Sequence, residues 1–216
     1  MIKENTYTEQ IKKRIKDKGA GEIFVISDFL DIAPYQTIKQ ILARLTADNL
    51  LRRIIDGVYE YPRYSEFLEE YASPSVDKIA EALARNNGWT IAPSGDTALN
   101  RLGLSTQVPA SWVYVTNGSN REYSVGKIKI RFKKTANKEL STGMSRKTAL
   151  VIQALKSTGR KNITGKTIER ISSKLNDEDK FKALAETQYT TRWIYEVIKQ
   201  ICNTGLSNAE YCKTSS

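Results

Sequence analysis

The sequence predicts an α+β fold, and three observations support this. Between residues 34 and 61, a helical pattern of apolar residues is followed by two strand-prone runs that meet at Asp56-Gly57. Further strand-prone runs lie between residues 89 and 134, with turn signals at Asn117-Gly118 and Gly126. Beyond residue 143 the chain reads as helices only. Helices and strands that separate along the chain in this way are typical of α+β proteins.

The first predicted domain covers residues 1–63. The run "TEQIKKRIKDK" predicts a helix that ends at Gly19, followed by a short strand-prone run and a short helix, "DFLDI". Pro34 suits the first position of the next helix. Apolar side chains recur on one face of that helix, with the helical period: Ile38, Ile41, Leu42 and Leu45. We expect Tyr35 at the edge of this buried face.

The hairpin completes this domain. An Asp-Gly pair between β-prone runs indicates a tight turn. A two-residue turn pairs Ile55 with Val58, Ile54 with Tyr59 and Arg53 with Glu60. Helix, short strand, helix, helix and hairpin is the order of a winged helix-turn-helix, which places a helix in the major groove of DNA.

The residues opposite the apolar face of this helix are suited to reading DNA. Gln36, Lys39 and Gln40 lie there, and glutamine can pair bidentately with adenine in the major groove. Arg52 and Arg53 on the hairpin can reach phosphates beside the groove. The alternative for the helix is ordinary exposed polarity. The alternative for the arginines is a solvated strand face, with Arg53 paired to Glu60.

The rest of the chain is predicted to hold a linker, a second domain and a flexible tail. Residues 64–74 form the linker, with a short acidic helix between Pro62 and Pro74. Residues 75–205 form a mixed α/β domain with a small antiparallel sheet and a C-terminal helical part. Residues 206–216 are the tail. In the helical part, Thr164 and Asp177 are candidate helix caps, and Gly159 and Gly205 are helix ends.

The charge indicates a polyanionic partner. The chain has 34 basic and 24 acidic side chains, net +10, and residues 126–216 hold 19 of the basic and 8 of the acidic ones. Nucleic acid fits this surplus, and an anionic membrane surface is the weaker alternative. The first ten residues lack the apolar core of a signal peptide, and no run of about 18 apolar residues occurs. We therefore expect a cytoplasmic protein without a membrane span.

Two basic segments are secondary candidates for phosphate contact. The strand "KIKIRFKK" alternates, which places Lys127, Lys129, Arg131 and Lys133 on one face. Either acidic helices or a polyanion must neutralise that face. The other segment is "RKNITGKT", with Arg160, Lys161 and Lys166, and its alternative is a solvated basic loop. It is not a nucleotide-binding P-loop, because Arg160 stands where that motif needs glycine.

Catalysis is not predicted. The chain has no histidine, which excludes Ser-His and Cys-His nucleophilic schemes and a Cys/His metal site at Cys202 and Cys212. We expect no disulfide, no metal and no cofactor. A metal-dependent nuclease is the enzyme alternative, with Asp96 and Glu122 as its carboxylates. Single-stranded RNA binding is a weaker alternative, because the clearest basic strand has no interleaved aromatic residues.

Residues 91–118, "IAPSGDTALNRLGLSTQVPASWVYVTNG", resemble the AbiEi antitoxin family of type IV, abortive-infection toxin-antitoxin systems. The preceding "LLRRIIDGVYEYPRY" resembles the winged-helix end of that family, and the likeness covers roughly residues 8–134. The positions that match the family's recognition helix and wing are Gln36, Lys39, Gln40, Arg44, Arg52 and Arg53.

The resemblance implies a bacterial phage-defence protein with two activities. Its N-terminal domain represses its own operon by binding promoter repeats in double-stranded DNA, and the remainder counteracts a nucleotidyltransferase-like toxin. A lasting complex with the toxin is not implied, and the resemblance identifies no neutralising residue. A stand-alone winged-helix transcriptional regulator is the alternative from the same class of DNA-binding proteins.

Overall fold

A computed structural model describes residues 2–135 and 144–204, and it has an α+β fold, as predicted. These residues form two compact units. The first unit holds the chain up to Thr90 together with Ser124–Lys127, and the second holds Ile91–Tyr123 and the chain from Ile128 onward. The predicted tail, Cys212 and the predicted helix end at Gly205 lie outside the described residues.

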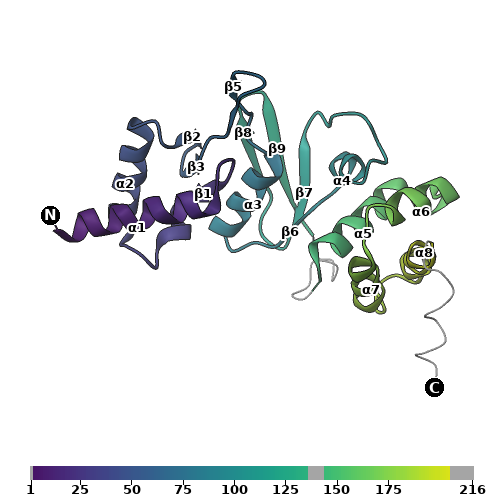
Figure 1. Ribbon diagram of the computed structural model, residues 1–216. Helices are drawn as coiled ribbons and strands as arrows, with labels where there is room; N and C mark the ends of the chain where they lie inside the picture. The colour runs from purple at the N-terminus through teal and green to yellow at the C-terminus, as the bar shows by residue number, and fades with distance from the viewer. Residues whose placement is uncertain (1, 136–143, 205–216) are drawn as a thin grey trace. The chain divides into compact units, whose positions relative to one another are not determined.

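The first unit contains a three-stranded antiparallel sheet and three long helices (Figure 1). In order, its elements are α1 (Ile2–Lys18), β1 (Ile23–Val25), η1 (Ile26–Phe29), α2 (Tyr35–Ala47), β2 (Arg52–Ile55), β3 (Val58–Glu60), β4 (Tyr64–Ser65), β5 (Glu70–Tyr71) and α3 (Val76–Asn86). The strand order in the sheet is β1-β3-β2. The predicted order of helix, strand, short helix, helix and hairpin is therefore present.

The core of the first unit lies between α1, η1, α2 and the sheet. The apolar face predicted for α2 is confirmed, because Ile38, Ile41, Leu42 and Leu45 are all buried. They pack with Ile11 and Ile15 of α1, Phe24, Phe29 and Tyr59, among other residues. Burying a side chain of this size stabilises the fold by about 1.5 to 3 kcal/mol. The apolar face of α2 therefore anchors the helix to the core, and its opposite face is not needed for packing.

The β2–β3 hairpin differs from the predicted register. Ile55 pairs with Val58 as predicted, but Arg53 pairs with Tyr59 and Arg52 with Glu60. The cause is a bulge between Arg53 and Ile55, which adds one residue to β2 and shifts every later pair by one position. Gly57 takes the left-handed φ of 73° that this tight turn requires.

The predicted linker is not a linker with a helix. Residues 64–71 form a β-hairpin, in which Tyr64 pairs with Tyr71 and Ser65 with Glu70. The following helix α3 contacts β1, β3 and η1, so it packs with the first unit. The boundary between the compact units therefore follows α3, rather than preceding it as the predicted domain from residue 75 requires.

Apart from the end of β8, which belongs to the first unit, the second unit begins with a four-stranded sheet of order β6-β7-β9-β8. Its strands are β6 (Ile91–Pro93), β7 (Trp112–Thr116), β8 (Arg121–Val125) and β9 (Ile128–Lys134), and the short helix α4 (Asp96–Arg101) follows β6. The sheet is small, as predicted, but it is mixed: β6 and β7 are antiparallel, whereas β7 and β9 are parallel. The reason is that β9 follows β8 through the turn at Gly126 and inserts between β8 and β7.

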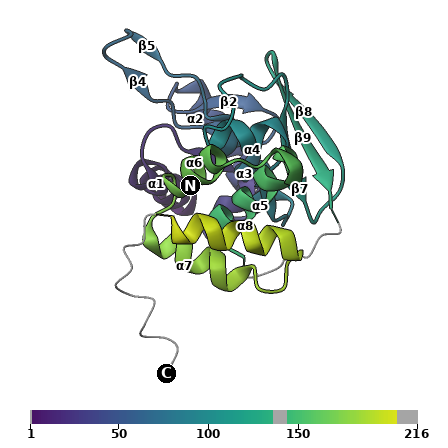
Figure 2. The same ribbon diagram turned by 90° about the vertical axis from the view of Figure 1, so that its right-hand side faces the viewer.

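Helices complete the second unit, and α7 and α8 lie side by side (Figure 2). They are α5 (Arg146–Thr158), η3 (Arg160–Asn162), α6 (Gly165–Ser172), α7 (Asp177–Glu186) and α8 (Arg192–Asn203). Gly159 ends α5 and Thr164 caps α6, as predicted. Asn176, not Asp177, caps α7, because its side chain accepts the amide hydrogen of Asp179. Buried apolar residues of α5, α6, α7 and α8 form one core with Ala98 and Leu102, while Ala149 of α5 packs with Ala92.

Candidate nucleic-acid interface

The outer face of α2 is polar, cationic and open to solvent. Gln36, Lys39, Gln40 and Arg44 are all exposed, as the apolar period of the helix predicts. No residue of α2 is acidic. A polyanion that approaches this face therefore meets amide and cationic groups without repulsion from any carboxylate of α2.

Tyr35 extends this face, although the sequence predicted it at the edge of the core. Its side chain is 52% exposed at the first position of α2. Pro34 caps the helix instead of opening it, which leaves Tyr35 in the first turn, before the apolar face begins at Ile38. A tyrosine here can stack on a sugar or donate to a phosphate oxygen.

The turn of the β2–β3 hairpin lies near the start of α2. Tyr59 of β3 is buried, and this burial raises the pKa of its hydroxyl. The same hydroxyl interacts electrostatically with Arg53 and Asp56 of the hairpin and with Tyr35 of α2. Charged and polar groups of the helix and of the hairpin therefore act on the same buried hydroxyl.

The two hairpin arginines have different environments. Arg52 donates from Nε and Nη2 to Glu60 Oε2, at 2.8 and 2.5 Å, and from Nη2 to the carbonyl of Ala72 at 2.9 Å. The Glu60 side chain is only 2% exposed, whereas that of Arg52 is 37% exposed. Arg52 therefore stabilises the hairpin, and the predicted contact of Arg52 with phosphate would have to compete with these bonds.

Arg53 remains a candidate for phosphate contact. It pairs with Asp56 in the turn, not with Glu60 as the alternative interpretation expected. Both side chains of this pair are more than half exposed. An exposed ion pair contributes only about 0 to 1 kcal/mol, so a phosphate can replace Asp56 at small cost.

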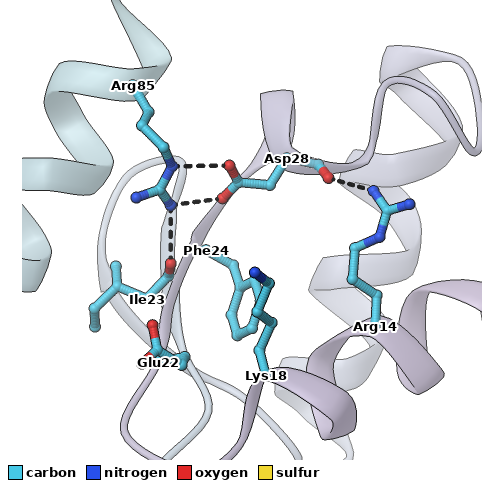
Figure 3. Close-up of a pocket in the computed structure, with 7 residues that line it drawn as sticks. All are labelled: Arg14, Lys18, Glu22, Ile23, Phe24, Asp28 and Arg85. Carbon is cyan, nitrogen blue, oxygen red and sulfur yellow. Dashed lines mark hydrogen bonds and ion pairs between the residues drawn. The ribbon is translucent and has the colours of Figure 1, made fainter.

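Two arginines hold η1, the short helix before α2 (Figure 3). Arg85 donates to both carboxylate oxygens of Asp28, at 3.1 and 2.9 Å, and to the carbonyl of Ile23. Arg14 donates to the Asp28 carbonyl at 2.7 Å and to both carboxylate oxygens of Asp31. The hydrogen bonds from Arg14 lower the pKa of Asp31 below its usual range. These bonds fix the segment that leads into α2.

Arg14, Asp28 and Arg85 also line a cavity of about 540 Å³. Its remaining lining residues are Lys18, Glu22, Ile23 and Phe24. Glu22 is paired with Lys78, so Lys18 is the one charged lining residue without an ion pair to another described residue. The charges around this cavity thus serve mainly to position η1 and α3 on β1.

The secondary phosphate candidates lie in two places. In β9, Arg131 and Lys129 pair with Glu122 of the neighbouring strand β8, at 2.6 and 3.9 Å. A strand carboxylate, and not an acidic helix, therefore neutralises part of that row, while Lys127 and Lys133 are exposed. Arg160, Lys161 and Lys166 are all exposed in η3 and the first turn of α6.

One comparison with known proteins identifies the family. A family model described as "Family of unknown function (DUF6088)" matches residues 10–183, from within α1 to within α7. The chain belongs to the DUF6088 family. No curated protein matches it. Every candidate DNA or phosphate contact named above lies inside the range that the DUF6088 model matches.

The described residues of this DUF6088 protein also bear on the nuclease alternative, on metal binding and on Cys202. Glu122, one carboxylate of the nuclease alternative, is held by Arg131, and Asp96 is exposed at the first position of α4. Within residues 2–135 and 144–204, no three Cys, Asp or Glu side chains gather as a metal site. Cys202 is buried, which raises the pKa of its thiol. No helix in the described part of the chain is long and apolar enough to cross a membrane.

Proposed function

We propose that this protein binds double-stranded DNA with α2 as its recognition helix and represses its own promoter. The observation that carries the proposal is the exposed face of α2, where Gln36, Lys39 and Gln40 stand with no carboxylate of the helix beside them. An α-helix fits the major groove, and glutamine and lysine make base-edge and phosphate contacts there.

The surroundings of α2 support this use. The element order from α1 to β3 supports a winged helix-turn-helix, in which η1 and α2 would be the helix-turn-helix pair and β2–β3 the wing. Tyr35 and Arg53 add an aromatic and a cationic group near the start of α2. Arg14 and Arg85 keep η1 in place, so little conformational entropy is lost when DNA binds.

A promoter-binding titration tests the proposal. The full chain is titrated into labelled duplexes from upstream of its own reading frame and into scrambled duplexes of equal length, with fluorescence anisotropy as the readout. We expect the upstream duplex to bind more tightly by about 10³ or more, which is the usual margin of specific over non-specific binding. Equal affinity for both duplexes contradicts promoter recognition.

Gln40→Ala tests the orientation of α2. Loss of a bidentate contact to adenine is expected to cost about 1 to 3 kcal/mol at one base pair and to relax the preference there. The measurement is a set of duplexes with each operator position substituted in turn. Gln188→Ala, at another exposed glutamine, is the matched control. An unchanged specificity profile for Gln40→Ala would show that a different face of the helix meets the bases.

We further propose that the protein acts as an antitoxin against a nucleotidyltransferase-like toxin. The support is the resemblance of residues 91–118, which form β6, α4 and β7 in the second unit. The face of α2 that we propose for DNA binding is in the other unit, so one chain can carry both activities.

Co-expression tests the antitoxin activity. The reading frame beside this one is expressed alone and together with the full chain, and cell survival is measured. We expect the neighbouring protein to be toxic and this chain to restore growth. A variant with Lys39→Ala and Gln40→Ala should still restore growth if neutralisation does not need DNA. A harmless neighbour would favour the stand-alone regulator.

A further inference from the structure

The cavity of about 540 Å³ beside η1 contains a cation that the protein itself does not neutralise. Lys18, the last residue of α1, is exposed and forms no ion pair with any described residue. Figure 3 shows its amine turned toward η1. A second cavity, of about 510 Å³, also has Lys18 in its lining. Lys18 therefore lines both cavities, and its charge attracts an anion to either.

Arg85 of α3 lines the same cavity and can bind the same anion. It donates to both carboxylate oxygens of Asp28, but the Arg85 side chain is 45% exposed and that of Asp28 is 21% exposed. Ion pairs that reach solvent contribute little to stability, so another carboxylate can replace Asp28 at small cost. Asp28 keeps a donor after this exchange, because the amide of Val25 donates to its Oδ2 at 2.9 Å. Arg85 is thus available to a ligand that brings its own carboxylate.

The charge around the cavity favours a ligand with one negative charge. The charged lining residues and their ion-pair partners are four cations and three carboxylates, net +1: Arg14, Lys18, Lys78 and Arg85 against Glu22, Asp28 and Asp31. A singly charged anion balances this surplus, whereas a doubly charged one exceeds it. A guanidinium binds a carboxylate through two parallel hydrogen bonds, as Arg85 already does with Asp28.

The size and the apolar part of the lining indicate an organic group on that anion. Small-molecule sites usually have volumes of about 300 to 1,000 Å³, and this cavity is within that range. Ile23 and Phe24 of β1 are its apolar lining residues. A small carboxylic acid with a hydrocarbon or aromatic group therefore matches the cavity in charge, volume and polarity.

We propose that this cavity binds a small organic monocarboxylate and that binding lowers the affinity of the protein for DNA. Lys18 and Arg85 hold the carboxylate, and the organic group lies beside Ile23 and Phe24. When Arg85 binds the ligand, it releases the Asp28 carboxylate, and η1 loses one of the two arginines that fix it. Helix α2 follows η1 in the chain and contacts it, so more conformational entropy is lost when DNA binds. The regulation rests on the proposed DNA binding, but the ligand site does not.

Calorimetry with benzoate tests the site in the full chain without DNA. We expect a dissociation constant of about 1 mM or lower, and Lys18→Ala should weaken binding by about tenfold or more. Lys16→Ala is the matched control and should bind like the wild type, because Lys16 is an exposed lysine of the same helix that lines neither cavity. A wild-type chain that does not bind benzoate, or a Lys18→Ala variant that binds it equally well, overturns the proposal.

Two further titrations test the class of ligand. Benzamide has the ring of benzoate without its charge and should not bind. Inorganic phosphate lacks an apolar group and should bind more weakly than benzoate. Equal binding of benzamide would show that Lys18 and Arg85 do not recognise a charge, and tighter binding of phosphate would assign the site to a phosphate ester. Either result overturns the monocarboxylate.

Asp28→Asn separates competition at Arg85 from a loss of folding. The asparagine keeps an acceptor oxygen for the amide of Val25 but removes the charge that competes for Arg85. Benzoate should therefore bind this variant more tightly than it binds the wild type, by about threefold or more. A damaged fold would not produce tighter binding. Unchanged or weaker binding contradicts the exchange of carboxylates at Arg85.

Fluorescence anisotropy with the upstream duplex tests the regulation. Saturating benzoate, compared with chloride at equal ionic strength, should raise the dissociation constant for the duplex by about 5- to 150-fold, the usual range of allosteric coupling. The DNA affinity of Lys18→Ala should not respond to benzoate. A wild-type affinity that benzoate leaves unchanged overturns the regulation. If the chain binds benzoate but no duplex, the proposed promoter recognition fails, whereas the calorimetric evidence for the site stands.

Discussion

The affinity of this protein for its own promoter is expected to fall by about 10³ to 10⁵ between about 50 and 200 mM salt, if six to ten phosphates are contacted. Each cation that neutralises a phosphate releases a condensed counterion, and added salt opposes that release. Lys39, Arg44 and Arg53 of the first unit are exposed candidates, and the second unit adds Lys133 and the loop with Arg160, Lys161 and Lys166. A logarithmic plot of the binding constant against salt concentration measures the slope. A flat plot would contradict phosphate contact by any of these residues.

The same plot assigns the contribution of the basic loop. Arg160→Ser combined with Lys161→Ser and Lys166→Ser removes three cations from exposed sites in η3 and α6, and the slope should decrease by about 3 if all three meet phosphates. Lys174→Ser, at an exposed lysine after α6, is a control and should leave the slope unchanged. If the loop variant has the wild-type slope, these side chains are the solvated basic loop that the sequence left as the alternative.

The helices were predictable because the period of their apolar residues depends only on local geometry. Ile38, Ile41, Leu42 and Leu45 recur with the spacing of one helix face, and the structure buries all four. The exposed positions of Gln36, Lys39 and Gln40 follow from the same geometry. Tyr35 was placed wrongly because a residue in the first turn precedes the part of the helix that the core covers. Its exposure depends on where the helix starts, which Pro34 marks only to within one position.

Pairing between strands was less predictable. The bulge in β2 leaves no mark in the alternation of "RRII", yet it moves the partner of Glu60 from Arg53 to Arg52. The parallel pairing of β7 with β9 is equally hidden, since strand order depends on contacts between residues far apart in sequence. Residues 64–71 contain three glutamates and a leucine, which suit a helix, but the tyrosine pair and the strained turn at Glu69 form a hairpin. The local pattern of residues did not reveal the pairing in any of the three cases.

Arg52→Ala is expected to lower the free energy of unfolding by about 2 to 3 kcal/mol. Removing one partner of a fully buried ion pair costs roughly 3 to 5 kcal/mol, and the cost is smaller here because the Arg52 side chain is 37% exposed. The loss arises because Glu60 remains as a buried carboxylate without its cation. Urea denaturation measures the change. Arg53→Ala is the matched control, one residue further along the strand, and it should cost less than about 1 kcal/mol because its partner Asp56 is exposed.

A second substitution separates this structural role from a role in DNA binding. Glu60→Gln removes the buried charge, so Arg52→Ala in that background should be less destabilising than in the wild-type chain. The DNA affinities of Arg52→Ala and Arg53→Ala are compared at a temperature where both variants are fully folded. Arg52→Ala should then retain most of its affinity, and Arg53→Ala should weaken all duplexes alike. If Arg52→Ala is as stable as the wild type but binds every duplex more weakly, Arg52 contacts phosphate. Its ion pair with Glu60 then does not stabilise the hairpin.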